Sequence, residues 1–376
     1  MARTAEIVGA GFAGLVAATA LAQRGWQVRL HERAAELRAF GAGIFIWENG
    51  LRVLQQVGAY EDAVRGSHEA PVYWVRDRNN QVVGKEVFGP AQGTRMFTLT
   101  RQKLYTALLN AARHAGVATR VNSHVVAATP DGTIRTEDGQ TFKADLVVGA
   151  DGVNSRVRDS LGLLKSRTTE AWGAIRLLIP RLPDDGDEIC TYQSSGERRT
   201  LYVPCDAENL YLCFTLPADD LAGQKLPFDV DMWGEDFPHL RTLYDRIGSE
   251  GRWDLYETIE LHSWTKGSVA MIGDAAHGMT PALGQGAGCA MMNGLSLAAY
   301  VDGQVDGQAD IPAVLRAWEQ DERPLTDHTQ RYAQSLTRGE NLSAAASGTK
   351  WTDDALRTAR HVPLGPGSRS ASATPA

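Results

Sequence analysis

Residues 6–32 read EIVGAGFAGLVAATALAQRGWQVRLHE, and this stretch decides the fold. Its first apolar residues predict a strand, and GAGFAG follows at once, before an apolar segment with helical spacing. Gly25 ends that helix, and a second predicted strand over residues 27–31 leads directly to Glu32. This order of strand, GxGxxG turn, helix, strand and acid is the fingerprint of a dinucleotide-binding βαβ unit, whose glycines admit a pyrophosphate and whose acid binds ribose hydroxyls. The candidate binding residues are therefore Gly9, Gly11, Ala13, Gly14 and Glu32.

A second glycine-rich stretch, GDAAHGMTPALGQGAG over residues 273–288, fits the other end of the same ligand. A short apolar strand precedes it, and a predicted helix over residues 290–300 follows it. Asp274 can accept hydrogen bonds from sugar-alcohol hydroxyls, and backbone N–H groups around Gly286 and Ala287 would face an anionic ring at the helix N-terminus. One dinucleotide spread over both stretches suits FAD better than NAD, because a flavin ring needs a loop of its own.

Two charged residues between these stretches are further candidates with open alternatives. Arg101 stands at the start of a predicted helix over residues 102–114 and could reach a pyrophosphate, although taken alone it is better explained as a solvated surface charge. Asp151 follows a predicted buried strand. It could orient Arg156 or Arg101, or touch a transient nicotinamide cofactor, and a simple turn aspartate explains it equally well.

The rest of the chain predicts ordinary secondary structure. We expect a glycine-rich bend over residues 37–46 and a helix over 49–58. Strands are expected over 71–76, 81–88, 121–128 and 133–136. A loosely helical segment over 228–247 and a closing helix pair over 311–337 follow. After residue 363 the composition of Gly, Ser, Pro and Ala predicts a disordered tail over 363–376.

A run of long strands without intervening helices begins at Trp172 and predicts a separate β-sheet whose face covers the cofactor. An arginine on a buried strand needs an anion or many hydrogen-bond acceptors. An internal salt bridge explains any single such arginine equally well. Polar residues on neighbouring predicted strands nevertheless favour a small anionic aromatic substrate, and they are Arg176, Arg199, Tyr211 and Tyr256.

The composition excludes several other classes of function. The net charge is −7 and no basic run occurs, which argues against nucleic acid as a partner. The 4 cysteines show neither CxxC spacing nor a metal pattern with histidine, so we expect no metal and reduced thiols in a cytoplasmic protein. No apolar run reaches membrane-spanning length, so we expect no membrane partner.

Several motifs together carry a resemblance to a known family. GAGFAGL with Glu32, the helix start at Arg101, GADGVNSRVR and GDAAHGMTPALGQGAG resemble the group A flavoprotein aromatic hydroxylases of the para-hydroxybenzoate hydroxylase type. The likeness covers roughly residues 5–363. It implies an α/β fold with a Rossmann-like FAD-binding domain, an interleaved antiparallel β-sheet substrate domain and C-terminal helices. The expected boundaries are 1–70, 95–170 and 262–302 for the first, 71–94 and 171–261 for the second, and 303–360 for the third.

The resemblance also assigns roles to individual residues. It implies that Gly286 and Ala287 meet the pyrimidine edge of the flavin. The residues that it assigns to the rest of FAD are Gly9, Gly11, Gly14, Glu32, Arg33, Arg38, Arg101 and Asp274. Pro281 would line the face where oxygen reacts. The substrate pocket would be lined by Arg176, Arg199, Tyr211, Tyr256 and Tyr73. The sequence departs from its closer relatives at Phe45, where we expect Tyr, and this puts a hydroxyl contact there in doubt.

The activity that the resemblance implies is FAD-dependent monooxygenation. NADH or NADPH would reduce the flavin transiently, and O₂ would form a C4a-hydroperoxide that delivers a hydroxyl group to the ring. The closer likeness is to oxygenases of vitamin B6 degradation, which implies a hydroxypyridine carboxylate such as 2-methyl-3-hydroxypyridine-5-carboxylate or a 5-pyridoxate-like acid, followed by ring opening.

Two other readings of the activity stay open. One is simple hydroxylation of a hydroxynicotinate- or salicylate-like acid without ring opening. The other is a flavin-binding module that no longer oxygenates. No residue stands out as a general base, and we expect a monomer or a homodimer.

Overall fold

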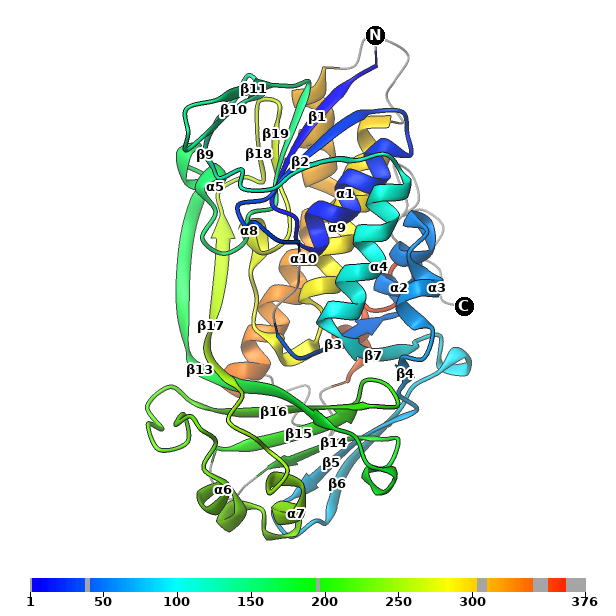
Figure 1. Ribbon diagram of the computed structural model, residues 1–376, viewed down its shortest axis with the longest axis vertical. Helices are drawn as coiled ribbons and strands as arrows, with labels where there is room; N and C mark the ends of the chain where they lie inside the picture. The colour runs from blue at the N-terminus through cyan, green and yellow to red at the C-terminus, as the bar shows by residue number, and fades with distance from the viewer. Residues whose placement is uncertain (1, 38–40, 194–196, 303–309, 341–350, 363–376) are drawn as a thin grey trace.

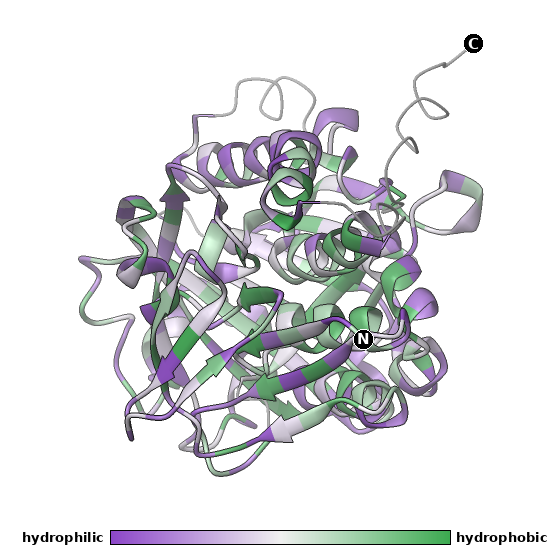
Figure 2. Ribbon diagram, turned by 90° about the horizontal axis from the view of Figure 1, so that it is seen from above, coloured by the Kyte–Doolittle hydropathy of each residue, from purple (hydrophilic) through white to green (hydrophobic). Residues whose placement is uncertain are grey.

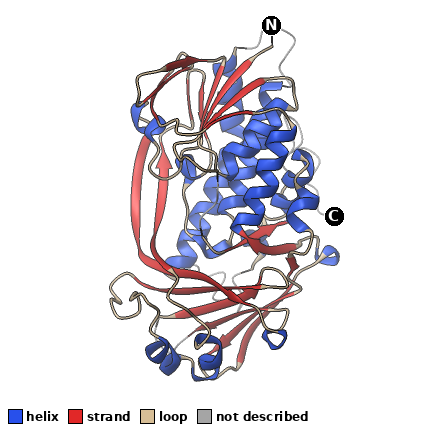
Figure 3. Ribbon diagram, viewed as in Figure 1, coloured by secondary structure: helices blue, strands red, loops and turns tan. Residues whose placement is uncertain are grey.

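The computed structural model describes residues 2–37, 41–193, 197–302, 310–340 and 351–362. The described chain is a mixed α/β fold (Figures 1 and 3). A mostly parallel sheet and a stack of helices form its upper part, and an antiparallel sheet forms its lower part. Hydrophobic residues concentrate in the middle of the molecule and hydrophilic residues toward its periphery (Figure 2).

The upper sheet has six strands in the order β18-β19-β12-β1-β2-β8. Neighbouring strands are parallel except for the β18–β19 pair. Both faces of a parallel sheet are normally covered, and the strand β12 is accordingly buried along its whole length. The strands in this order are Thr265–Lys266, Val269–Met271, Leu146–Gly149, Thr4–Val8, Gln27–His31 and Ala118–Arg120.

The helices pack on one another beside this sheet (Figure 1). Helix α1 lies closely against α9. A Cβ atom at Gly294 would be only 2.9 Å from the carbonyl oxygen of Ala13, so the glycine permits this close approach. The five longest helices are α1 (Phe12–Ala22), α2 (Glu48–Val57), α4 (Arg101–His114), α9 (Gly286–Asp302) and α10 (Ile311–Arg338). The short helices are α3 (Tyr60–Val64), α5 (Arg156–Ser160), α6 (Val230–Asp236), α7 (Arg241–Tyr244), α8 (Asp274–His277) and α12 (Asp353–Leu356).

The lower sheet has seven strands in the order β17-β13-β16-β15-β14-β5-β6. All neighbours are antiparallel except β14 and β5. The long strands β13 and β17 run down one side of the molecule and connect the two parts (Figure 1). In sheet order the strands are Arg252–Leu261, Leu164–Pro180, Asn209–Pro217, Arg199–Pro204, Ile189–Gln193, Val72–Asp77 and Val82–Val87.

Two sheets of three strands complete the fold. One has the order β3-β7-β4 and lies between the helices and the lower sheet (Figure 1); its strands are Gly43–Trp47, Met96–Thr100 and His68–Glu69. The other has the order β11-β10-β9, with strands Thr141–Lys143, Thr133–Thr136 and Val125–Thr129. Within the described ranges, four 3₁₀ turns occur at Pro90–Gln92, Pro183–Asp185, Pro238–Leu240 and Pro281–Leu283.

Several sequence predictions differ from this structure. The closing helix pair is one helix, α10, which continues through Pro324. A proline removes one helical hydrogen bond, but contacts on both sides of it hold the helix: Glu319 accepts from the backbone N–H of Trp264, and Gln330 donates to the carbonyl of Ile259. Strand β3 overlaps the end of the bend expected over 37–46, of which residues 38–40 lie outside the described part of the chain. The segment over 228–247 holds two short helices, α6 and α7, with the 3₁₀ turn at Pro238–Leu240 between them.

The remaining differences concern strands. The strand expected over 121–128 begins only at Val125, as β9, because residues 121–124 form a loop after β8 in which Asn122 has a left-handed conformation (φ 50°). Strand β14 had no prediction. Among the helices in the described part of the chain, none combines the length and apolarity needed to cross a bilayer. The predicted tail over 363–376 lies outside the described residues.

Candidate active site

The glycine turn between β1 and α1 has an inner and an outer side. A Cβ atom at Gly14 would lie 2.0 Å from the carbonyl oxygen of Gly9, and one at Gly9 (φ +101°) would lie 2.4 Å from that of Ala150. These two glycines are therefore required by the packing of the turn itself. A Cβ atom at Gly11 would meet no atom within 4 Å. Gly11 thus leaves the outer side of the helix N-terminus open, as the approach of a pyrophosphate requires.

Glu32 lies beside this turn at the end of β2. Its carboxylate accepts hydrogen bonds from the backbone N–H groups of Ala10 (3.0 Å) and Ala34 (2.9 Å). Behind it, the buried His31 contacts Glu6 and Ser123, each at 2.7 Å. Backbone donors therefore hold the carboxylate of Glu32, the ribose-binding candidate, and His31 anchors the end of the strand that carries it. Arg33 is exposed next to it, and Arg38 lies outside the described residues.

Asp274 comes close to the same helix N-terminus from the other end of the chain. A Cβ atom at Gly273 (φ +62°) would lie 2.9 Å from the Cβ atom of Ala13, so the two glycine motifs touch. The Asp274 side chain reaches solvent, yet protein surrounds it on most sides. This partial loss of water raises the pKa of its carboxyl group, and the nearby charge of Arg101 offsets part of the rise.

Arg101 lies between the cofactor motifs and the lower sheet. Its guanidinium is 5.0 Å from the ring of Phe12 in α1, and a Cβ atom at Gly41 would lie 2.7 Å from its side chain. Burial lowers the pKa of Arg101, the charge of Asp274 raises it, and the charge of Arg176 in the lower sheet lowers it again. Arg101 is therefore close to Asp274 on the cofactor side and to Arg176 on the side of the lower sheet.

Asp151 has the contacts of a turn residue. Its carboxylate accepts hydrogen bonds from the Ser155 hydroxyl (2.5 Å) and from the backbone N–H groups of Arg156 (2.8 Å) and Val157 (3.2 Å), at the start of α5. These bonds engage the backbone of Arg156 and not its guanidinium. Of the interpretations drawn from the sequence, the structure thus favours the turn aspartate over a carboxylate that orients an arginine side chain.

The Pro281 loop leads into the N-terminus of α9. A 3₁₀ turn spans Pro281–Leu283, and Gly284 (φ +62°) follows it. Pro281 is exposed, while Gly286 and Ala287 are half-buried in the first turn of α9, which contains no acidic residue. The positive end of this long helix is thus open to a negatively charged ring.

One face of the lower sheet brings the predicted substrate residues together. Arg176 on β13 pairs with Cys213 on β16, and Arg199 on β15 pairs with Thr215. Tyr211 is two residues before Cys213 and therefore points to the same face. The hydroxyl groups of Tyr256 and Thr215 are 3.3 Å apart. Four of the predicted residues, Arg176, Arg199, Tyr211 and Tyr256, therefore share one surface.

The two arginines on this face differ in their partners. The Arg176 guanidinium lies 5.6 Å from the Tyr256 ring and 3.7 Å from the carboxylate of Asp254. The Arg199 guanidinium lies 5.2 Å from the ring of Trp172, and no carboxylate in the described parts of the chain forms an ion pair with it. Arg199 is therefore the cation best able to bind an external anion.

The tyrosines on this face are neutral hydrogen-bonding groups. Burial raises the pKa of Tyr256 to about 12 and raises that of Tyr211 well above its usual value. Burial lowers the pKa of Arg176, and the neighbouring Tyr211, Cys213 and Tyr256 outweigh that effect, so its net shift is upward. At neutral pH the face thus carries charged arginines beside protonated phenols.

Strand β3 joins the cofactor loops to this face. A Cβ atom at Gly43 would lie 2.4 Å from the Tyr211 ring, so glycine permits the contact. The rings of Phe45 and Tyr211 are 6.3 Å apart, and a Cβ atom at Gly284 would lie 3.3 Å from Phe45. A substrate bound on the sheet would therefore lie close to the Pro281 loop.

Tyr73 belongs to the buried apolar cluster that also contains Tyr211. Its hydroxyl is 2.6 Å from that of Thr191, and its ring contacts Trp351 at 5.5 Å. The sequence had suggested Tyr73 for the pocket but had missed Trp172, Cys213 and Thr215. Strand alternation could have found the last two, since both lie at even spacing from Tyr211.

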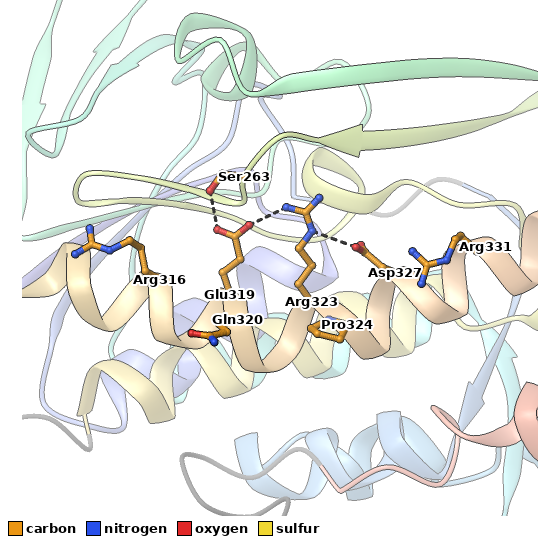
Figure 4. A pocket seen from close by; sticks show the side chains of 8 residues that line it. All are labelled: Ser263, Arg316, Glu319, Gln320, Arg323, Pro324, Asp327 and Arg331. Atoms are coloured by element: carbon orange, nitrogen blue, oxygen red, sulfur yellow. Dashed lines mark hydrogen bonds and ion pairs between the residues drawn. The ribbon is translucent and has the colours of Figure 1, made fainter.

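His277 and a separate groove have other roles. Burial lowers the pKa of His277 to about 4, so it is neutral, and its Nε2 accepts from the amide of Asn293 at 3.1 Å. Along α10 runs a surface groove of about 610 Å³ (Figure 4). In it Arg323 lies between Glu319 and Asp327, and it shares no residue with the candidate site. We interpret these ion pairs as structural.

The chain matches known proteins over most of its length. The family model for the FAD binding domain covers residues 2–332. A probable 2-heptyl-3-hydroxy-4(1H)-quinolone synthase of Rhodococcus erythropolis is 43% identical over 345 residues, 89% of this chain and 88% of the relative. A 6-hydroxynicotinate 3-monooxygenase of Pseudomonas fluorescens is 29% identical over 316 residues, 78% of this chain and 80% of the relative.

A solved structure matches even more of the chain. The tetrameric form of 2-methyl-3-hydroxypyridine-5-carboxylic acid oxygenase is 42% identical, covers 96% of this chain and 97% of its own, and has a TM-score of 0.88. The α/β fold, the flavoprotein family and the enzyme class expected from the sequence are thereby confirmed. The open glycine turn, Asp274 and the α9 N-terminus fit FAD. The chain therefore belongs to the FAD-binding domain family and is an FAD-dependent aromatic monooxygenase.

Proposed function

We propose that the protein hydroxylates a small anionic nitrogen heteroaromatic acid, of the hydroxypyridine carboxylate type, at the expense of NADH or NADPH and O₂. The observation that carries this proposal is Arg199, a half-buried cation without a carboxylate partner among the described residues, on the same sheet face as Arg176. A partly desolvated arginine gains most from a carboxylate that it can bind through two hydrogen bonds.

The cofactor would be bound by both glycine motifs. The α1 N-terminus at Gly11 and Arg101 would bind the pyrophosphate, Glu32 the ribose, and Asp274 the sugar-alcohol chain. Gly286 and Ala287 would face the pyrimidine edge of the flavin. When bound, FAD supplies the electron transfer and the activation of oxygen, and the chain supplies binding, orientation and a site closed to bulk water.

The substrate would be oriented by the lower sheet. Arg199 binds its carboxylate, and the neutral phenols of Tyr211 and Tyr256 hydrogen-bond to polar atoms of the ring. Phe45 and Pro281 form the apolar boundary toward the cofactor. None of these five residues is a histidine, and His277, four positions before Pro281, is held neutral by burial, which lowers its pKa to about 4. Activation of the ring would therefore come mainly from the substrate's own hydroxyl group.

A second candidate substrate is a 2-alkyl-4-quinolone. The specific observation in its favour is the relative of 43% identity, whose name is that of a 2-heptyl-3-hydroxy-4(1H)-quinolone synthase. Such a ring is neutral and has a long apolar chain. It would use the apolar residues between β3 and the sheet and would gain little from Arg199.

The test is anaerobic reduction of the purified holoenzyme by NADH and by NADPH. The panel contains hydroxypyridine carboxylates, hydroxynicotinate, salicylate and an alkylquinolone, and air is then admitted and the product weighed by mass spectrometry. Faster flavin reduction with a pyridine acid supports the proposal. A gain of two oxygens and two hydrogens indicates ring opening, and a gain of one oxygen indicates simple hydroxylation. Acceleration by the quinolone alone would replace the proposal with the second candidate.

A further inference from the structure

The C-terminal segment 351–361, here called the C-terminal strap, runs across the junction between the cofactor part and the lower sheet. The hydroxyls of Thr352 and Tyr332 are 2.7 Å apart, which attaches its beginning to α10. The guanidinium of Arg360 donates to the Thr94 hydroxyl at 2.9 Å, which attaches its end near β7. Within the strap, Trp351, Ala355, Leu356 and Ala359 are buried in one apolar cluster.

Trp351 connects the two sides of the active site. Its ring is 4.9 Å from that of Trp47 on β3 and 5.5 Å from that of Tyr73 on the lower sheet. The same cluster contains Leu283 of the Pro281 loop. A Cβ atom at Gly284 would lie 3.3 Å from the indole nitrogen of Trp47. Trp351 thus contacts Trp47, which lies beside Gly284 of the cofactor loop, and Tyr73 of the lower sheet.

Trp47 depends on these contacts for its position. It is 1% exposed, and its indole N–H finds no hydrogen-bond partner among the described residues. Packing against Trp351 and against Phe88, at 5.1 Å, therefore orients the ring. Loss of the Trp351 ring would leave a space beside Trp47 into which that ring could turn, away from Gly284.

The other end of the strap reaches the cofactor loop by a second route. The carbonyl of Ala359 accepts the backbone N–H of Asn49 at 2.9 Å. The Asn49 side chain donates to the buried amide oxygen of Gln285 at 3.2 Å, directly before Gly286 and the N-terminus of α9. Both ends of the strap are thus linked to residues 284–286, one through Trp47 and the other through Asn49.

We propose that the C-terminal strap positions the cofactor loop against the substrate sheet, with Trp351 as its positioning residue, and thereby sets how efficiently oxidation of the nicotinamide cofactor is coupled to hydroxylation. This rests on the proposed roles of Pro281, Gly286 and Ala287. Reacting groups must be held closely, so a small shift of this loop lowers transfer to the ring while FAD stays bound. The oxygen that is not transferred then leaves as hydrogen peroxide, reduced by the two electrons that the nicotinamide supplied.

The experiment compares Trp351→Ala and Trp351→Phe with Trp233→Ala and Trp233→Phe in the holoenzyme. Trp233 is a matched control, because it is also buried in an aromatic cluster (5.0 Å from Phe214) but lies in the core on the other side of the lower sheet. For each variant, FAD content, melting temperature, product formed per NADH oxidised and hydrogen peroxide released are measured with the aromatic acid that accelerates reduction most.

The proposal expects a coupling defect that follows Trp351 and not stability. Trp351→Ala should retain FAD, form at least threefold less product per NADH and release correspondingly more peroxide, and Trp351→Phe should restore most of the coupling. The Trp233 variants should melt earlier with unchanged coupling. Normal coupling in Trp351→Ala, or an equal loss in Trp233→Ala, would overturn it.

A second readout does not depend on the substrate. The visible absorption and fluorescence of bound flavin, without any aromatic acid, should change in Trp351→Ala and stay unchanged in Trp233→Ala. If no acid in the panel is hydroxylated but this flavin signal responds, the strap proposal stands and the substrate proposal fails. An unchanged flavin spectrum in Trp351→Ala contradicts the strap proposal on its own.

Discussion

The cofactor end and the substrate face of this enzyme are built by different means. At the cofactor end the backbone sets the geometry: Cβ atoms at Gly9, Gly14 and Gly273 would fall 2.4, 2.0 and 2.9 Å from neighbouring atoms. On the substrate face side chains set the geometry, because alternate residues of antiparallel strands carry the arginines and tyrosines.

This difference explains which part of the molecule tolerates change. A close approach of backbones admits one residue type, so any substitution there should remove function outright. A side chain on a strand can be exchanged while the strand pairing stays intact, so the substrate can change within one fold. Substitutions at the cofactor end should accordingly have larger effects than those on the sheet, and the following predictions test that order.

The largest effect should come from Gly14→Ala. Its added methyl group would overlap the carbonyl oxygen of Gly9 at 2.0 Å, which forces α1 away from β1 and destroys the phosphate turn. We expect protein without flavin, seen as loss of visible absorbance in the purified sample, together with a lower melting temperature.

Gly11→Ala is the matched control for this prediction. Its methyl group would meet no protein atom within 4 Å, so the fold and the melting temperature of the apoprotein should be kept. FAD affinity should still fall, because the methyl group occupies the side on which a pyrophosphate approaches. A Gly11→Ala enzyme with normal flavin affinity would contradict the proposed location of the pyrophosphate.

The second largest effect should appear as a pH dependence at the cofactor end. His277 is 1% exposed, and burial lowers its pKa to about 4 from 6.5. The unfolded chain therefore binds a proton near pH 6.5 and the folded chain does not, so stability is full above that pH and is lost as the pH falls toward 4. The loss should be about 2–3 kcal/mol, measured by denaturant unfolding between pH 7 and pH 4.5.

His277→Gln provides the comparison. A glutamine stays uncharged over the whole range, so the variant should lose less stability than the wild type as the pH falls. Its stability at pH 7 should be lower, because the acceptor for the Asn293 amide is altered. Equal slopes for both proteins between pH 7 and pH 4.5 would show that another group causes the acid sensitivity.

The same difference between the two regions decides what the sequence could predict. The turn at residues 9–14 and the Gly-Asp loop at 273 were predictable, because backbone geometry there demands glycine and leaves a motif. The family, the fold class and the enzyme class followed from those motifs, and the comparisons confirm them. The domain boundaries, the site roles and the substrate stay predictions.

What the sequence did not reveal depends on contacts between distant segments. Strand β14 and the single helix α10 are fixed by neighbouring elements: β14 pairs with both β15 and β5, and α10 continues through Pro324 because contacts on both sides hold it. Trp351 lies 304 positions after Trp47 in the sequence, and no local pattern predicts that their rings meet. Strands and helices follow from periodicity, but the neighbours of a buried ring do not.

On the substrate face, Arg199→Met should give an intermediate effect. Loss of a hydrogen-bonded charge pair with the substrate should weaken its binding by about 10- to 100-fold, or about 1.4–2.8 kcal/mol. FAD content and stability should stay normal, because Arg199 forms no ion pair within the described residues. Titration of flavin absorbance with the aromatic acid measures the change.

Arg176→Met sharpens this prediction. Asp254 keeps its closer ion pair with Arg252 at 2.8 Å when Arg176 is removed, so this variant should lose affinity with little change in stability. An Arg199→Met enzyme with unchanged affinity for the acid would remove Arg199 from the proposed site. It would also strengthen the case for a neutral quinolone.

The smallest effect should come from Trp172→Leu. The Arg199 guanidinium lies 5.2 Å from the Trp172 ring, and a cation–π contact at a partly exposed site is worth about 0.5–1 kcal/mol. Without the ring, Arg199 stays charged but is held less firmly, so substrate affinity should fall by about two- to fivefold. In an Arg199→Met background the same substitution should have no further effect on affinity, because the ring acts only through the guanidinium. An equal loss in both backgrounds would mean that Trp172 contacts the substrate itself.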